Sequence, residues 1–534
     1  MMEGIFVGGS DHPMWLDLAV GNRHGLIAGA TGTGKTVSLR VLTEGFSAAG
    51  VPVFLADVKG DLGGLARPGE GLAPILNRAA ALKMEWRGEG MPVVFWDVFG
   101  RQGHPVRATV SDVGPILLAR MLSLNETQEG VLQVAFRYAD DEGLLLLDLK
   151  DLRALLSHLA DNSADVSARY GAVAPASVAA IQRALLALEN QGGDAFFGEP
   201  ALDFADLMLT APDGRGAVSV LAADELLNSP RLYATVLLWM LSELFENLPE
   251  VGDVPKPKLV FFFDEAHLLF EDAPPALVAQ IQQVVRLIRS KGVGIYFVTQ
   301  SPLDIPERVL GQLGHRIQHA LRAFTPRDQK AVRAAAETMR ANPALDTVEA
   351  LQQLAKGEAL VSLLDANGVP SPVQRTTIAP PRSSLAVLPT DQRQRILDTS
   401  PIKGRYDAVT DRESAYELLT LRANAPAETS MRSAPRPQGS GIWTRPDGAP
   451  PPPPQPAPPP RGQRGEQSGE QEQEAEPDRP WGGGRPQRRP AARRTTDSMA
   501  EAAMKSVARG LASSIGSTVG RQIARGVLGA ILKR

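Results

Sequence analysis

Short apolar runs of strand length recur along the first 300 residues, and longer segments with helical spacing lie between them. The apolar runs occupy residues 24–28, 51–57, 92–97, 216–221, 259–263 and 294–300. Helical spacing is found in residues 37–43, 231–247 and 277–290. Strands without polar alternation are buried on both faces, and strands that alternate with helices form parallel sheets covered by helices. The pattern therefore predicts an α/β fold with a parallel-rich sheet.

A different pattern fills residues 113–195, where apolar residues recur at helical spacing and β-branched residues are few. Residues 144–156 and 177–188 are the clearest examples. We predict a helical insertion here, between an N-terminal part of the core, residues 1–112, and a C-terminal part, residues 196–424. The insertion is either a lid or subunit contact, or packing bulk, and the sequence leaves these alternatives open.

The composition changes near residue 425. Proline dominates residues 450–460, and alternating acids follow in residues 466–476. Such a segment buries too little apolar surface to offset its ordering entropy, so we predict a disordered Pro-rich linker over residues 425–495. Helix-forming residues return in residues 496–534, with cations at Lys505, Arg509, Arg521, Arg525, Lys533 and Arg534. This basic, small-residue-rich helix suits a partner helix, an anionic membrane surface or DNA, and a weakly ordered tail is the alternative.

The charge differs between the body and the tail of the chain. Residues 425–534 hold 17 Lys and Arg against 10 Asp and Glu, whereas residues 1–424 hold 39 against 50 and carry a charge of −11. The chain has no cysteine, which excludes disulfides and thiolate metal sites. The N-terminus lacks the pattern of a signal peptide, and no apolar run approaches the roughly 18 residues that span a bilayer. We therefore expect a cytoplasmic protein without a transmembrane segment.

The first motif with a defined chemistry lies between the run at residues 24–28 and the helical segment after it. The phosphate-loop pattern GxxxxGK[ST] is matched at each fixed position by Gly29, Ala30, Thr31, Gly32, Thr33, Gly34, Lys35 and Thr36. Glycines let backbone N–H groups turn toward phosphates, and the helix N-terminus adds a favourable dipole. We predict that the loop binds ATP, that Lys35 neutralises the β- and γ-phosphates and that Thr36 ligates Mg²⁺. A Gly-rich loop without a nucleotide is the alternative.

A second motif stands at the end of the apolar run at residues 259–263. Two carboxylates, Asp264 and Glu265, follow this predicted strand directly. In phosphate-loop ATPases an acid at the end of such a strand holds Mg²⁺, so we assign the metal to Asp264, directly or through water. Glu265 is placed to orient and deprotonate the attacking water as the general base. An Asp-Glu pair is common by chance, but not downstream of a complete phosphate loop.

Other strand ends carry further polar candidates, because ligands of parallel sheets bind at the carboxyl ends of the strands. Asp57, Lys59 and Asp61 lie at the end of the run at residues 51–57. They are candidates to help hold Mg²⁺ or a catalytic water, and an ordinary turn is the alternative. Gln300 is our candidate for a sensor that hydrogen-bonds the γ-phosphate and the water, with a turn residue as the alternative.

Residues 314–327 alternate enough to predict a strand that presents Arg316 and Arg322. An arginine donated across a subunit boundary stabilises the charge of phosphoryl transfer. The chain holds one phosphate loop and one Asp-Glu strand, so a neighbouring subunit would complete each site. Arg316 and Arg322 are the candidates for this role, and salt-bridged surface arginines are the alternative.

Together these segments resemble the HerA/FtsK group of ring ATPases, most closely the bacterial HerA-like proteins of the YjgR type. The resemblance rests on the phosphate loop, on Phe261-Phe-Phe-Asp-Glu-Ala-His267, on Val298-Thr-Gln-Ser-Pro302 and on residues 315–328, and it extends to about residue 423. It implies a RecA-like core, a homohexamer, ATP hydrolysis with Mg²⁺ and translocation on double-stranded DNA. It also puts the following residues at the family's functional positions: Lys35, Thr36, Asp264, Glu265, Gln300, Arg316 and Arg322.

Expectations about partners differ in their support. HerA itself has an N-terminal β-barrel that resembles a docking platform for a nuclease, whereas 28 residues precede Gly29 here, so a nuclease partner of that kind is not expected. The −11 charge of residues 1–424 argues against nonspecific duplex binding, which depends on neutralising phosphates. A ring needs positive charge only at its pore, for which Arg286, Arg289 and Lys291 are candidates. A ring ATPase that acts on a protein assembly is the alternative function, with a protein partner still unknown.

Overall fold

The computed structural model describes residues 4–271, 275–322 and 325–424. The chain divides into two compact units, Met1–Asn424 and Ala425–Arg534. The linker and the basic helix that the sequence predicts in the second unit lie outside the described residues. The first unit contains every candidate site residue.

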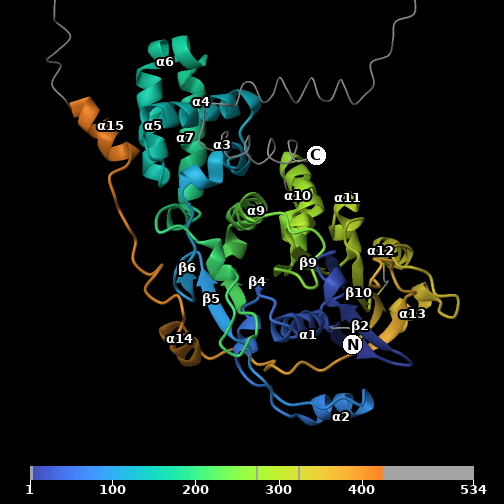
Figure 1. Cartoon of the computed structure of the whole chain (residues 1–534). Helices are drawn as coiled ribbons and strands as arrows, with labels where there is room; N and C mark the ends of the chain where they lie inside the picture. Colours follow the sequence, from blue (N-terminus) through green and yellow to red (C-terminus); the bar gives the residue numbers. More distant parts are fainter. Residues whose placement is uncertain (1–3, 272–274, 323–324, 425–534) are drawn as a thin grey trace, which may run out of the picture. The chain divides into compact units, whose positions relative to one another are not determined.

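One mixed sheet of twelve strands forms the centre of the described residues (Figure 1). Its order is β2-β1-β12-β11-β10-β3-β9-β8-β4-β7-β5-β6. Pairs from β10 to β6 are parallel, and pairs from β2 to β10 are antiparallel. This arrangement confirms the prediction of a parallel-rich α/β fold. The strands are β1 (Gly4–Gly9), β2 (Pro13–Asp17), β3 (Gly25–Ala28), β4 (Val53–Asp57), β5 (Val93–Asp97), β6 (His104–Pro105), β7 (Val218–Ala222), β8 (Leu259–Phe263), β9 (Val293–Thr299), β10 (His315–His319), β11 (Glu358–Ser362) and β12 (Gln374–Ile378).

The central strands are buried along their whole length because helices cover both faces of the sheet. Every residue of β4, β5, β7, β8 and β9 is buried. Successive side chains of a strand point to opposite faces. Accordingly, Phe261 and Phe263 of β8 belong to one hydrophobic core, and Val260 and Phe262 belong to a second core on the other face.

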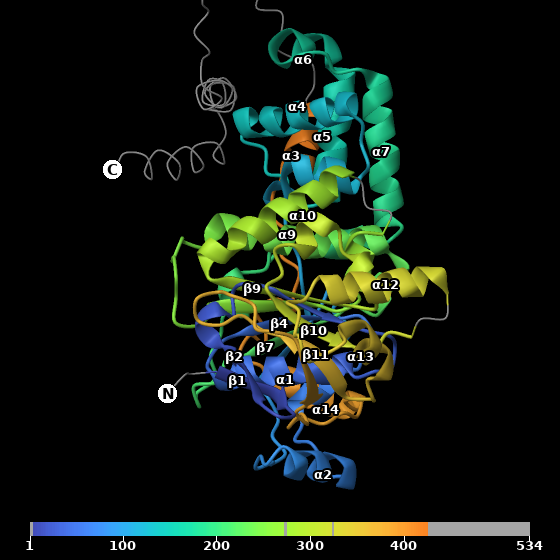
Figure 2. The ribbon, with the colours of Figure 1, turned by 90° about the vertical axis from the view of Figure 1, so that its right-hand side faces the viewer.

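Helices lie on both faces of the sheet, as the edge-on view of Figure 2 shows. α9 (Pro230–Asn247) and α10 (Pro275–Leu287) cover one face, and α1 (Lys35–Ala48) and α14 (Thr390–Asp398) cover the other. α2 (Ala73–Ala81) projects beyond α1 and α14. Shorter helices lie between β9 and β11. α11 (Glu307–Leu310) follows β9, α12 (Pro326–Glu337) follows β10, and α13 (Thr347–Gln353) precedes β11.

Six helices occupy the chain between β6 and β7, and they share one hydrophobic core with α9. Three of them begin with a capping box, in which two side chains three residues apart satisfy backbone N–H groups. The pairs are Thr109 with Asp112, Asn125 with Gln128, and Asp148 with Asp151. The six helices are α3 (Val110–Met121), α4 (Glu126–Glu142), α5 (Leu149–Asp161), α6 (Ser163–Tyr170), α7 (Pro175–Glu189) and α8 (Gly193–Phe196).

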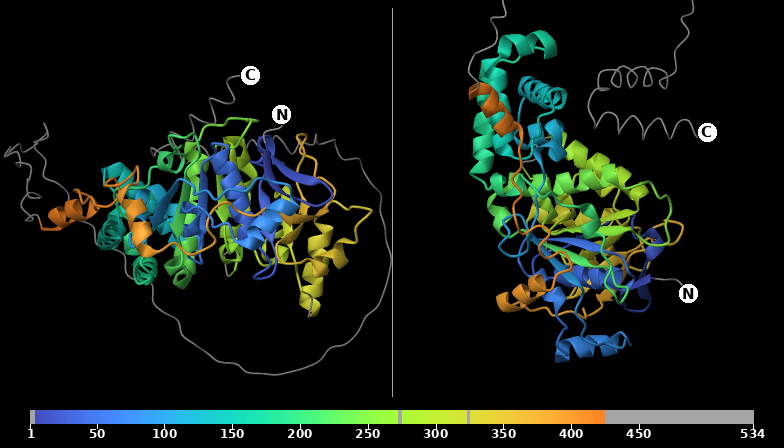
Figure 3. Two further views of the ribbon diagram at one scale, coloured as in Figure 1. Left: turned by 90° about the horizontal axis from the view of Figure 1, so that it is seen from below. Right: turned by 60° about the vertical axis from the view of Figure 1, so that its left-hand side comes forward.

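The chain beyond α14 returns to these helices and ends in α15 (Ala415–Asn424), which packs against α5 (Figure 3). On the way, the ring of Tyr406 meets the ring of Trp96 edge-on, with centroids 5.4 Å apart. Arg412 forms two hydrogen bonds with Glu199. This returning segment therefore fastens the helical insertion to the sheet.

β12, in the antiparallel part of the sheet, has no counterpart among the predicted strands. β12 mixes exposed, half-buried and buried residues, so it lacks the continuous apolar run that marks a central strand.

In the part of the chain that the structure describes, no single helix is long and apolar enough to cross a membrane. α6 and α7 meet that test of length and composition only as a pair bent by 97°.

Candidate nucleotide-binding site

The phosphate loop joins β3 to α1 at the carboxyl edge of the sheet. Gly29, Gly32 and Gly34 have φ angles of 151°, 78° and 123°, which favour glycine. A Cβ atom on Gly29 would lie 2.5 Å from the Cβ atom of His319, so close packing also requires glycine there. The buried Lys35 donates a hydrogen bond of 2.6 Å from Nζ to the carbonyl of Gly29. These contacts hold Lys35 against its own loop.

Residues from β10 and from the turn before β11 support the phosphate loop. His319 lies with Nε2 2.8 Å from the hydroxyl of Ser38 and with Nδ1 2.9 Å from the carbonyl of Glu358. Burial lowers the pKa of His319 to about 4, so the ring is neutral near pH 7. Since a carbonyl only accepts, Nδ1 carries the proton and Nε2 accepts from Ser38. The N–H of Gly357 also donates to the carbonyl of Thr33 at 3.0 Å.

Asp264 and Glu265 follow β8, which only β9 separates from β3. The two residues are 6% and 7% exposed. Burial lowers the pKa of Lys35 and the charge of Lys59 lowers it further, whereas Glu265 and Asp264 act in the opposite sense. Burial raises the pKa of Asp264 to about 6. The two motifs, far apart in the sequence, therefore form one electrostatically coupled group.

Glu265 has a strained backbone conformation, and its side chain lies close to Lys59 and His267. Its φ and ψ of 48° and 46° lie in the left-handed region, which costs about 1–2 kcal/mol for a residue with a Cβ atom. Its Oε1 atom lies 2.5 Å from Nζ of Lys59, in the loop after β4. Its Oε2 atom lies 3.2 Å from Nδ1 of His267 without the alignment of a hydrogen bond. Burial alone would raise the pKa of Glu265, but the hydrogen bond and charge of Lys59, together with the charges of His267 and Lys35, lower it.

The residues around Asp264 fit a magnesium ion. Oδ1 of Asp57 and Oδ1 of Asp61 are buried and lack a hydrogen-bond partner among the described residues. Burial and then the charge of Asp61 raise the pKa of Asp57 to about 6, and a cation would offset this repulsion. No three His, Asp or Glu side chains in the described residues are arranged to hold a metal by themselves. Such a site still suits Mg²⁺, because Mg²⁺ binds one or two protein oxygens and completes its coordination shell with phosphates and water.

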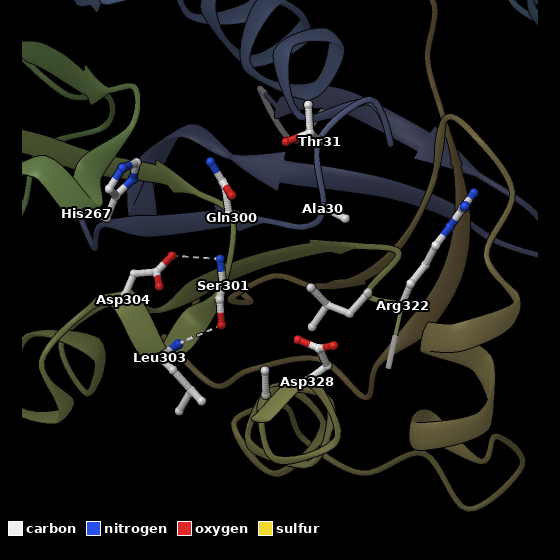
Figure 4. Close-up of a pocket in the computed structure, with 11 residues that line it drawn as sticks. Ala30, Thr31, His267, Gln300, Ser301, Leu303, Asp304, Arg322 and Asp328 are labelled. Carbon is white, nitrogen blue, oxygen red and sulfur yellow. Dashed lines mark hydrogen bonds between the residues drawn. The ribbon is translucent and has the colours of Figure 1, made fainter. Parts of the chain in front are cut away.

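A cavity of about 310 Å³ adjoins the tip of the phosphate loop. Its walls include Thr31 of the loop, Gln300 after β9 and Arg322 after β10. Figure 4 shows Gln300 and His267 on one side of this cavity and Arg322 on the other, with its guanidinium directed away from them. The structure thus brings the sensor candidate Gln300 and the phosphate loop to one cavity.

Asp304 organises the turn that carries Gln300. One carboxylate oxygen accepts hydrogen bonds from the hydroxyl of Thr299 at 2.6 Å and from the N–H of Ser301 at 2.9 Å. Figure 4 shows the second of these bonds. Ser301 in turn caps the short helical turn that follows, and the two residues form a capping box. The signal for this role is present in the sequence as the spacing of Ser301 and Asp304.

The predicted strand that presents both arginines is wrong. β10 ends at His319, and α12 begins at Pro326, so Arg322 lies beyond the strand and is exposed. Arg316 is on the strand but buried, and it donates hydrogen bonds to the carbonyls of Leu313 at 3.0 Å and Leu310 at 2.7 Å. Burial lowers the pKa of Arg316 to about 10. A single alternating strand cannot present both side chains because the chain leaves the sheet after His319.

The cations considered for a pore lie at the opposite edge of the sheet from the phosphate loop. Arg286, Arg289 and Lys291 precede β9, at the amino ends of the parallel strands. Arg289 lies 3.6 Å from a carboxylate oxygen of Asp253, and Nζ of Lys291 lies 5.4 Å from the ring centroid of Phe245. These cations therefore lie away from the edge of the sheet that carries the phosphate loop, and their role at a pore stays a prediction.

The structure adds residues to the site that the sequence did not single out. His319 supports the phosphate loop, His267 lies beside Glu265, and Asp304 positions the turn of Gln300. Lys59 was a candidate for the metal or the water, but it contacts Glu265 instead. The pairing of Ser301 with Asp304 has a local sequence signal, and His267 follows Glu265 by two residues. The contacts of His319 and Lys59 join segments that are far apart in the sequence.

A phosphate loop between a strand and a helix of a parallel sheet, with an Asp-Glu pair after a nearby buried strand, defines a phosphate-loop ATPase of RecA-like fold. The model of the HerA-like helicase C-terminal family matches residues 5–534, and the chain belongs to that family. This match confirms the resemblance to the HerA/FtsK group.

The comparison with curated proteins finds no match. Among solved structures, the bacterial conjugative coupling protein TrwBdeltaN70 is 14% identical, with 72% of this chain and 92% of that chain covered and a TM-score of 0.46. VirB4 of Thermoanaerobacter pseudethanolicus is 16% identical, with 71% of this chain and 96% of that chain covered and a TM-score of 0.42. The plasmid coupling protein TrwB in complex with ADP and Mg²⁺ is 14% identical, with 72% and 92% covered and a TM-score of 0.46.

Proposed function

We propose that this chain is a Mg²⁺-dependent ATPase and the subunit of a ring motor that translocates on or remodels double-stranded DNA. One observation carries the ATPase part: the buried Asp264 and Glu265 follow β8, which only β9 separates from the strand that leads into a complete phosphate loop with its buried Lys35. Such a set binds the phosphates of ATP, holds the cation and activates water. Membership of the HerA-like family supports the motor part.

Each residue has a task in the proposed reaction. The backbone N–H groups of residues 29–36 and Nζ of Lys35 bind phosphate oxygens. Thr36 and Asp264 hold Mg²⁺, which when bound offsets phosphate charge. Glu265 accepts a proton from the water whose oxygen forms the new bond to the γ-phosphorus. The bond from that phosphorus to the bridging oxygen breaks, and its electron pair leaves with ADP. Gln300 orients the water as the sensor.

We infer a homohexamer from the incomplete site of one chain. Arg322 is exposed on the wall of the cavity beside the phosphate loop. In a ring, a heterologous interface repeats around a closed symmetry axis, so an exposed arginine at each boundary serves the neighbouring site. Arg316 is the second candidate, and it would have to leave two backbone carbonyls to act there. Such a motor belongs in the cytoplasm, where ATP and duplex DNA are available.

The charge of the chain favours a second candidate, a ring ATPase that acts on a protein assembly. Residues 1–424 carry a charge of −11, and duplex binding is driven largely by Lys and Arg contacts with phosphates. Two of the three cations considered for a pore, Arg289 and Lys291, already face a carboxylate and an aromatic ring. The DNA hypothesis therefore needs a direct test.

The test is the ATPase rate with and without duplex DNA, at one fixed ionic strength and with Mg²⁺ present or chelated. We expect hydrolysis that needs Mg²⁺ and rises several-fold with duplex DNA. The Lys35→Ala protein, which should lose nucleotide binding, is purified in the same way and measures contaminating ATPase. Mg²⁺-dependent hydrolysis that does not respond to DNA favours the protein-assembly function, and no hydrolysis above the Lys35→Ala control contradicts the ATPase itself.

A further inference from the structure

The contact between Lys59 and Glu265 places an obstacle in the proposed reaction. The general base needs a carboxylate that is free to accept a proton, yet Oε1 of Glu265 lies 2.5 Å from the ammonium of Lys59. An ammonium in contact with a carboxylate stabilises its charged form, which makes the carboxylate a weaker base, so Lys59 has to release Glu265 before the proton is transferred.

A γ-phosphate is well placed to take Lys59 away from Glu265. Nζ of Lys59 lies 2.5 Å from Oε1 of Glu265, the residue assigned to activate the water that attacks the γ-phosphorus, so its ammonium lies beside the expected position of the γ-phosphate. A bound γ-phosphate brings more negative charge to this point than one carboxylate does. The side chain of Lys59 is 41% exposed, whereas that of Glu265 is 9% exposed, so Lys59 is the partner with room to move.

The loop that carries Lys59 is anchored on either side of it. Oδ2 of Asp57 accepts a hydrogen bond of 3.0 Å from the N–H of Leu62, and Arg40 donates to the carbonyl of Asp61 at 2.5 Å. The backbone is thus held, and the four-carbon stem of Lys59 can move its charge by rotation of side-chain bonds alone.

We propose that Lys59 is a nucleotide-state switch: it pairs with Glu265 when no γ-phosphate is bound and transfers to the γ-phosphate of ATP, which frees Glu265. This inference rests on the proposed ATPase function and adds a residue that distinguishes ATP from ADP. With ADP bound, Lys59 returns to Glu265 and the base is again blocked. Lys59 also contacts the substrate in this scheme, so it acts as a catalytic residue in the ATP state.

The switch is tested by binding rather than by turnover. Dissociation constants for ADP and for a non-hydrolysable ATP analogue, both with Mg²⁺, are measured by calorimetry for the full chain and for Lys59→Met. Lys59→Met keeps the apolar stem and removes the charge. We expect affinity for the ATP analogue to fall about tenfold or more, as for other hydrogen bonds to charged groups, and affinity for ADP to change less than about twofold. Lys403→Met, which removes a surface ion pair with Asp398, is the matched control and should change neither constant.

Glu265→Gln supplies a second readout that a structural role for Lys59 would not move. Without the ion pair, nothing has to be broken when Lys59 moves, so the ATP analogue should bind about twofold to fivefold more tightly, the range for a partly exposed pair. Loss of the negative charge of Glu265 also reduces repulsion of the phosphate. The double variant separates these effects, because the gain from Glu265→Gln should shrink when Lys59 is already Met.

Each outcome decides between the hypotheses. An equal loss of affinity for ADP and the ATP analogue in Lys59→Met, or an equal gain from Glu265→Gln with and without Lys59, overturns the switch and leaves the ATPase function standing. A wild-type chain that binds neither nucleotide overturns the proposed function and the switch together. Selective loss of the ATP analogue, with a gain that depends on Lys59, supports the switch.

Discussion

The ends of β8 and β9 are neighbours at the carboxyl edge of the sheet, but they hold their functional residues in different ways. After β8, Glu265 is buried, left-handed in its backbone and paired with Lys59 from another strand end. After β9, Gln300 is exposed on a turn that its own sequence neighbours, Ser301 and Asp304, hold in place. Contacts between distant segments stabilise the charge of Glu265, whereas hydrogen bonds within one turn fix the position of Gln300.

This difference matches the roles proposed for the two residues: Glu265 takes part in the reaction, and Gln300 senses the bound nucleotide. A buried, strained carboxylate is typical of a reactive site, but its negative charge needs positively charged or hydrogen-bonding partners to be stable there. An exposed amide on a capped turn carries no net charge and needs only a fixed direction. Substitutions at the first site should therefore act on binding and turnover, and substitutions at the second site should act mainly on geometry and stability.

The largest effect is expected from Lys35→Ala, which removes the charge that faces the phosphates. Nucleotide affinity should fall by more than about a thousandfold, since several hydrogen bonds to charged groups, each worth about 1.5–3 kcal/mol, are lost. Calorimetry with ADP and Mg²⁺ checks this. The melting temperature should not fall, because Lys35 donates only to carbonyls of its own loop and burial already disfavours its charge. An unchanged nucleotide affinity would contradict the assignment of the phosphate loop.

Arg322→Ala should rank second, with a loss of about a thousandfold in ATPase rate if the arginine acts across a subunit boundary. The rate is measured at saturating ATP, alone and in mixtures with Glu265→Gln. Neither variant should be active alone, but the mixture should recover part of the activity, because some boundaries pair an intact Glu265 with an intact Arg322. A mixture no more active than its parents, with subunit exchange demonstrated, would count against this role.

Glu265→Gln should slow hydrolysis by about a hundredfold to a thousandfold, the contribution of a positioned general base. ATP binding should persist, because the amide keeps the shape of the side chain. Single-turnover hydrolysis and calorimetry on the same protein separate the two effects. Hydrolysis at the wild-type rate would show that another group accepts the proton.

These predictions also show which features of the fold and of the site can be inferred from the sequence. The phosphate loop, Asp264 and Glu265 follow from local motifs, and β3 and β8 follow from continuous apolar runs, because a strand covered on both faces has little choice of residue. Lys59 and His319 could not be assigned their contacts, since each meets a residue from another part of the chain. Pairing between distant strands depends on the sheet order, which periodicity does not encode.

The two arginines show a second limit. Alternation in residues 314–327 was a correct sign of a strand, but the strand ends at His319, and the burial of Arg316 depends on carbonyls of the preceding loop. A polar residue inside a strand can face water or hydrogen-bond inward, and the sequence does not distinguish these cases. Arg322 is exposed because the chain has already left the sheet.

The smallest effect is expected from Asp304→Ala, which tests the turn after β9. Thr299 is fully buried, and its hydroxyl would lose its acceptor, which should lower the free energy of unfolding by about 1–3 kcal/mol. The ATPase rate should fall less than about tenfold, because Gln300 is loosened and not removed. Chemical denaturation and steady-state kinetics measure the two effects.

Two controls sharpen this last test of the comparison. Asp346→Ala removes the acidic N-cap of α13, away from the cavity, and should cost about 1 kcal/mol of stability without changing ATPase. Thr299→Val removes the buried hydroxyl itself, so adding Asp304→Ala to it should cost less stability than Asp304→Ala alone, because the orphaned donor is already absent. A loss of activity as large as that of Glu265→Gln would mean that Asp304 takes part in the reaction, and the turn after β9 would then belong with the charged site after β8.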